Sequence, residues 1–154
     1  NMILKNGKRL DGMGDSMPIG SVIEYNGTDI PDGWEVLPAE GVEIYSTTET
    51  LIGTYANRPL YRIILTTNKG SLPNNTYVNI PHNIPNVDYI VSIKGLVFEA
   101  PITDDGWFYP IPYVSPTVGH IAVVGRRDVI QVEASMDLSK MHSNIIIDYT
   151  KTTD

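Results

Sequence analysis

The stretch LYRIILTT, residues 60–67, alternates its side chains between two faces, as a β-strand does. Tyr61, Ile63 and Leu65 fall on one face of such a strand, and the residues between them fall on the other. The same preference runs through the chain, because Ile, Val and Thr together number 45 against 14 for Ala and Leu. The 13 glycines and 11 prolines are spread along the sequence and leave little room for a long helix. The sequence therefore predicts an all-β fold of short strands joined by turns, arranged as an antiparallel β-sandwich.

Two further stretches bear on the arrangement of these strands. The run from Ile145 to Ile147 would be buried on both faces, which fits either a central strand of the sandwich or a subunit interface. Prolines interrupt WFYPIPYVSP, residues 107–116, so we expect this segment at a sheet edge or in a loop. Residues 47–59 are the best place for one short helical turn, with Thr48 ahead of Glu49. Further strands are expected near residues 19–25, 34–37, 77–80, 89–100, 120–125, 129–134 and 144–154.

The N-terminal quarter differs in character from the rest. Residues 1–17 are polar and glycine-rich and are predicted to be a linker at the start of a fragment. Residues 18–41 are predicted to form a two-strand neck, in which a Pro-Asp-Gly turn at 31–33 leads into Trp34. Trp34 would pin that turn to a core, because its large apolar area must be buried. A two-strand unit alone is marginal, so we expect it to dock on another part of the protein. Residues 42–154 are then the sandwich head.

Charge and composition narrow the classes of partner. The formal net charge is −7, from 11 basic and 18 acidic residues. This charge argues against binding to nucleic acid, which depends on clustered basic residues that neutralise phosphates. No apolar run approaches the roughly 20 residues that a membrane helix needs, so no membrane insertion is expected. The chain has no cysteine, which excludes disulfides and thiolate zinc sites.

The sequence offers little that indicates catalysis. His82, His120 and His142 lie far apart, without the local spacing of metal ligands. Neither a glycine-rich phosphate-binding loop nor a Gly-x-Ser-x-Gly elbow is present. We therefore predict that the protein is not an enzyme and uses neither a cofactor nor a metal.

The aromatic segment DDGWFYPIPY, residues 104–113, is the candidate binding site. Trp107, Tyr109 and Tyr113 lie close together between prolines, and Asp104 and Asp105 precede them. Aromatic rings on a stiff loop are stacking platforms for sugars, and carboxylates accept hydrogen bonds from sugar hydroxyls. The alternative is that the rings cap the end of the sandwich and that the two aspartates only form a turn.

Several segments together resemble a known family. MPIGSVIEYNGTDIPDGWEVL, residues 17–37, is similar to the tail-collar-like segment of phage tail fibres. The segments from Tyr45 to Leu65 and from Leu72 to Gly95, with the closing NIIIDYTKTTD, resemble the head of phage receptor-binding proteins of Gram-positive hosts. After Trp34 the chain reads EVLPAEG in place of the Cys-Asp-Gly of many collar sequences, so the resemblance implies a neck and not a full collar domain.

The resemblance implies a homotrimeric virion protein at the tip of a tail fibre or baseplate, bound to other tail proteins. Its expected function is host attachment through a bacterial cell-wall or surface glycan. The resemblance supplies no ligand residues. A structural domain that trimerises or caps the fibre without touching a receptor is the alternative, and a glycan-cleaving enzyme is a third hypothesis that rests only on scattered carboxylates.

Overall fold

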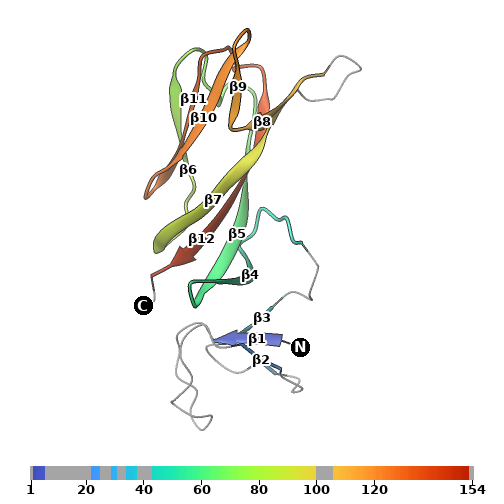
Figure 1. Ribbon diagram of the computed structural model, residues 1–154, viewed down its shortest axis with the longest axis vertical. Helices are drawn as coiled ribbons and strands as arrows, with labels where there is room; N and C mark the ends of the chain where they lie inside the picture. The colour runs from blue at the N-terminus through green and yellow to red at the C-terminus, as the bar shows by residue number, and fades with distance from the viewer. Residues whose placement is uncertain are drawn as a thin grey trace. The chain divides into compact units, whose positions relative to one another are not determined.

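The computed structural model describes residues 2–5, 22–24, 29–30, 34–37, 43–99 and 106–152. These residues form strands and connecting turns, which confirms the predicted all-β class (Figure 1). No helix long and apolar enough to cross a membrane occurs among them. The predicted neck–head boundary at residues 41 and 42 and the 31–33 turn lie outside the described residues.

The strands form three sheets, with the orders β2-β1-β3, β6-β11-β10-β9 and β4-β5-β12-β7-β8. The four- and five-stranded sheets are the antiparallel sandwich that the sequence predicted. The strands are β1 (Met2–Lys5), β2 (Val22–Glu24), β3 (Trp34–Val36), β4 (Thr50–Tyr55), β5 (Arg58–Thr67), β6 (Tyr77–Pro81), β7 (Val87–Phe98), β8 (Phe108–Ile111), β9 (Tyr113–Ser115), β10 (Gly119–Gly125), β11 (Val129–Ala134) and β12 (His142–Lys151).

The chain divides into two compact units, and β5, β7 and β12 contribute residues to both. The first unit takes Asn1–Ile63, Asn86–Tyr89 and Asp148–Asp154. The second unit takes Ile64–Pro85 and Ile90–Ile147.

The N-terminal sheet of the first unit contains one strand more than expected. Strand β1 pairs antiparallel with both β2 and β3, so the small sheet has three strands. The sequence predicts a linker over residues 1–17, whereas residues 2–5 form β1. The polar, glycine-rich composition of that stretch gives no sign of a strand of four residues. Trp34 of β3 is buried, with 6% of its surface exposed, as predicted.

The predicted helical turn within residues 47–59 is wrong. Residues 50–55 are strand β4, which pairs antiparallel with β5. Ala56 and Asn57 join the two strands with φ of 48° and 61°. Positive φ at both central residues is the geometry of the two-residue hairpin turn that matches the twist of paired strands, and asparagine adopts it readily.

The central strand of the five-stranded sheet is β12 (Figure 1). Ile145 and Ile147 have no exposed surface, and Thr67 of β5 shares a buried hydrogen bond of 2.8 Å with Ser143 of β12. The central position accounts for the isoleucine run and so confirms the first of the two readings of that run.

The proline-interrupted segment lies at sheet edges, as predicted. Strand β8 is the last strand of the five-stranded sheet and β9 is the last strand of the four-stranded sheet. The chain passes from one sheet to the other at Pro112, between β8 and β9. Proline has no backbone N–H to donate, and at this position between two edge strands none is needed to pair with a neighbouring strand.

Candidate functional site

Three of the predicted site residues form a row of rings in the second unit. Trp107 precedes β8, Tyr109 lies in β8 and Tyr113 begins β9. The rings of Trp107 and Tyr109 are nearly parallel, at 6°, with centroids 6.4 Å apart, because residues two apart on an extended chain share a face. Tyr113 meets Tyr109 edge to face with a centroid distance of 5.0 Å. We call these three residues the aromatic ladder.

The ladder is open to solvent at one end. Trp107 is 63% exposed, which is far more than a ring that caps a core would be. Tyr109 and Tyr113 are half-buried and anchor the row to the two edge strands. The geometry therefore favours a ligand surface over the alternative of a sandwich cap.

A cleft of about 230 Å³ adjoins the ladder. Trp107 and Tyr109 line it, so the ladder and the cleft share two rings. Three residues with charged side chains also line it, Glu99, Asp137 and Lys140. Ligand pockets for drug-sized molecules measure about 300–1,000 Å³, so this cleft suits one small group such as a single sugar residue. Its remaining lining is apolar and consists of Val118, Met136, Leu138 and Met141.

Asp137 is the most strongly fixed charge of the cleft. Its Oδ1 accepts hydrogen bonds from the hydroxyl of Ser139 at 2.6 Å and from the backbone N–H of Ser139 at 2.9 Å. These bonds, together with the positive charge of Lys140, hold the pKa of the Asp137 carboxyl below its ordinary value. The group is therefore an anion at neutral pH and can accept hydrogen bonds from a ligand.

The predicted site and the observed site overlap in part. The structure brings together Trp107, Tyr109 and Tyr113, whereas Asp104 and Asp105 lie outside the described residues. The sequence did not point to Asp137 and Lys140, which lie in the connection between β11 and β12. They are about 30 residues from the rings, and only the pairing of the strands brings them to the cleft.

The three histidines have separate surroundings. His82 is buried, with Nδ1 accepting from the N–H of Ile84 and Nε2 facing the carbonyl of Arg126. His120 lies 3.7 Å from Glu133, and the ring of His142 stacks on Phe98. Within the described part of the chain, no group of three or more His, Asp or Glu residues is arranged to hold a metal ion.

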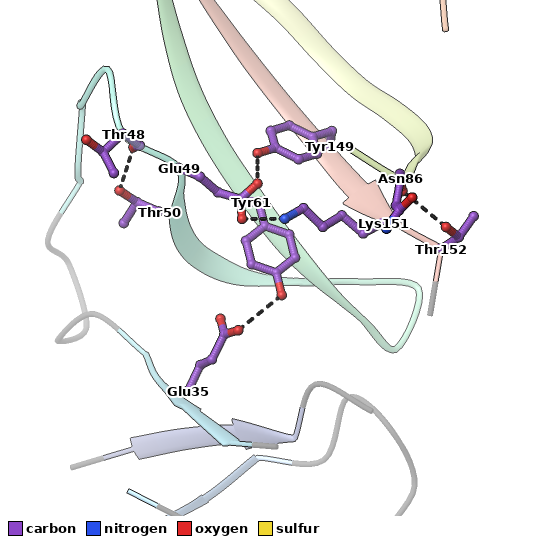
Figure 2. Close-up of polar contacts among 9 residues, drawn as sticks. All are labelled: Glu35, Thr48, Glu49, Thr50, Tyr61, Asn86, Tyr149, Lys151 and Thr152. Atoms are coloured by element: carbon purple, nitrogen blue, oxygen red, sulfur yellow. Dashed lines mark hydrogen bonds and ion pairs between the residues drawn. The ribbon is translucent and has the colours of Figure 1, made fainter. Parts of the chain in front are cut away.

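A second polar cluster lies in the first unit (Figure 2). Glu49 accepts hydrogen bonds from the Tyr149 hydroxyl and the Lys151 ammonium group. The Tyr61 hydroxyl donates a long hydrogen bond of 3.5 Å to Glu35 of β3. The ring of Tyr61 stacks on the ring of Tyr149, with centroids 6.0 Å apart. These side chains bind one another and Tyr61 and Tyr149 are buried, so the cluster joins strands of the unit and offers no open site.

Comparison of the chain with protein-family models, with curated protein sequences and with solved structures finds no match. The resemblance to phage receptor-binding heads therefore stays a prediction.

Proposed function

We propose that this chain is the distal head of a phage tail fibre and binds a bacterial cell-wall or surface glycan during adsorption. The observation that carries the proposal is the solvent-exposed ring of Trp107 at the end of the aromatic ladder, beside a cleft lined by acidic and basic residues. As a head of this kind it would form a homotrimer at the tip of the virion and attach to other tail or baseplate proteins.

The chemistry of the site favours a sugar over other ligands. A pyranose ring presents C–H groups on its faces and hydroxyls around its edge. The rings of Trp107 and Tyr109 offer flat apolar area at low entropic cost, since each side chain has only two rotatable angles. Asp137 and Glu99 can accept hydrogen bonds from hydroxyls. A single glycan chain can therefore stack on the ladder and place one residue in the cleft.

The direct test is binding of the fluorescently labelled chain to cell-wall polysaccharides from a panel of Gram-positive bacteria. Trp107→Ala is expected to abolish binding without lowering the melting temperature, because the ring is mostly exposed. Tyr89→Ala is the matched control, since Tyr89 is an aromatic residue of similar exposure, 62%, that lies outside the ladder. Equal binding by the wild type and Trp107→Ala would refute the proposal, and release of reducing ends from the polysaccharide would favour a glycan-cleaving enzyme.

The second candidate is a structural domain that trimerises or caps the fibre. The outer face of the four-stranded sheet favours it, because exposed apolar side chains share that face. The register pairs Val114 with His120 and Tyr77 with Glu133, and Val124 lies on the same side as His120. Val114 is 81% exposed and Val124 is 51% exposed. A second copy of the chain would bury these side chains.

Light scattering distinguishes the two candidates when it is combined with the binding assay. Val114→Asp with Val124→Asp is expected to convert a trimer to a monomer if this face is the interface. A trimer that binds none of the polysaccharides would favour the capping domain. A monomeric wild type at micromolar concentration would contradict the trimer in both candidates.

A further inference from the structure

We propose that the cleft beside the aromatic ladder selects a sugar with a protonated primary amine over the N-acetylated form of the same sugar. The inference rests on the proposed glycan-binding function and names the class of sugar that the same site takes. It comes from the charges that line the cleft, where two carboxylates oppose one ammonium group.

Asp137 has acceptor capacity left for a donor from the ligand. Both bonds from Ser139 go to its Oδ1 and hold that oxygen in place. A carboxylate accepts about four hydrogen bonds over its two oxygens, so Oδ2 can still accept N–H groups of a ligand. An ammonium group brings three such donors and a full positive charge, and an acetamide brings one donor and no charge.

Trp107 and Glu99 add to the same preference. A cation placed over an indole face within about 6 Å of its centroid is attracted by the electrons of the ring. The exposed Trp107 ring lines the cleft together with Glu99, so an amine held between them gains both an aromatic face and a second anion.

Lys140 acts in the opposite direction. Lys140 lines the same cleft, and its positive charge repels a cationic ligand. Among the described lining residues, the charges of Glu99 and Asp137 outnumber that of Lys140, so this lining carries a net charge of about −1 and favours a cation over a neutral group. Loss of Asp137 should therefore weaken the preference for the amine form of the sugar, whereas loss of Lys140 should strengthen it.

The experiment measures the affinity of the full chain for a chitosan tetrasaccharide and for the matching, fully N-acetylated chitin tetrasaccharide by calorimetry at mildly acidic pH. The wild type is expected to prefer the amine form by roughly 2- to 5-fold, the range of an exposed ion pair. Asp137→Asn should abolish the preference, Lys140→Ala should increase it, and added salt should weaken it. Asp128→Asn is the control, since it removes the same charge from an exposed site that does not line the cleft.

Equal affinity for the two tetrasaccharides, or a preference for chitin, overturns the inference. If Trp107→Ala still weakens the binding of both, the proposed glycan-binding function stands. Binding of neither tetrasaccharide by the wild type also overturns the inference, and the cell-wall assay with Trp107→Ala then decides the proposed function separately. An unchanged preference in Asp137→Asn, with a melting temperature equal to that of the wild type, overturns the role of Asp137.

Discussion

The guanidinium of Arg62 in β5 and the carboxylate of Asp148 in β12 meet through two parallel hydrogen bonds. Nε lies 2.7 Å from Oδ1 and Nη2 lies 2.9 Å from Oδ2. Both residues are buried, and the guanidinium also lies over the ring of Tyr45 at 4.9 Å from its centroid. Because water cannot solvate either charge there, each charge depends on the other.

Asp148→Ala is therefore expected to lower the free energy of unfolding by about 3–5 kcal/mol, because it leaves Arg62 buried without its counter-charge. The matched control is Asp88→Ala, which breaks the ion pair between Asp88 and Arg58, in which the Arg58 side chain is 47% exposed. That change should cost less than about 1 kcal/mol. Urea denaturation of both variants checks the prediction, and equal losses would contradict it.

The buried hydroxyl of Tyr149 predicts a loss of stability at alkaline pH. Burial, and then the neighbouring Glu49, raise the pKa of Tyr149 above its ordinary value of 10.0. The folded state therefore keeps a proton that the unfolded state releases above pH 10.0, and stability that is complete below that pH falls as the pH rises. This group alone contributes a loss of about 1.4 kcal/mol per pH unit above that point.

Tyr149→Phe removes the titrating hydroxyl and tests this dependence. At pH 7 it should cost about 1.5–3 kcal/mol, because the lost hydrogen bond goes to the carboxylate of Glu49. Between pH 9 and pH 11 its stability should fall less steeply than that of the wild type. Urea denaturation across this range measures both slopes, and parallel slopes would refute the assignment.

Gly95 of β7 lies against the backbone of β12. A Cβ at this position would lie 2.2 Å from the carbonyl oxygen of Asn144 and 3.1 Å from the Cα of Ile145. Gly95→Ala should therefore lower the free energy of unfolding by about 3 kcal/mol or more, the upper end of the range typical of overpacking, because backbone atoms would have to move. Gly125→Ala is the milder control, since its Cβ would meet only the ends of the Ile90 and Ile93 side chains. Melting temperatures rank the two, and the reverse order would contradict this account.

Local patterns were sufficient to predict most of the fold. The alternation in β5 and the prolines around β8 and β9 depend on a residue's immediate neighbours, and both patterns predicted the observed strands. The isoleucine run in β12 left two readings open, and the central position of the strand matches the first of them. The turn at Ala56 and Asn57 was missed because alanine rarely adopts a positive φ, so nothing in the sequence distinguished a hairpin from a helical turn. Strand β1 was missed because it is stabilised by pairing with β2 and β3, which lie many residues away.

The candidate site likewise contains residues that local sequence patterns predict and residues that only long-range strand pairing brings in. The sequence pointed to Trp107, Tyr109 and Tyr113 because they lie within seven residues of one another. It could not point to Asp137 or Lys140, because a polar connection between two strands looks like any other solvated turn. Strand pairing brings this connection to the cleft beside the aromatic ladder, and the pattern of a single segment does not contain that information.

The two tryptophans of the chain lie in opposite environments, and fluorescence can separate them. Trp34 is 6% exposed and Trp107 is 63% exposed. In Trp107→Phe the remaining Trp34 emission should be blue-shifted and poorly quenched by acrylamide, whereas in Trp34→Phe the remaining Trp107 emission should be red-shifted and strongly quenched.

The same two residues should differ in their effect on stability. Trp34→Ala should lower the free energy of unfolding by about 3–5 kcal/mol, as truncation of a packed tryptophan does. Trp107→Ala should leave the free energy of unfolding within about 0.5 kcal/mol of the wild-type value. Strong quenching of Trp34 in the folded Trp107→Phe variant would show that β3 does not pack as described, and a large loss of stability in Trp107→Ala would place that ring in the core and remove the basis of the ligand surface.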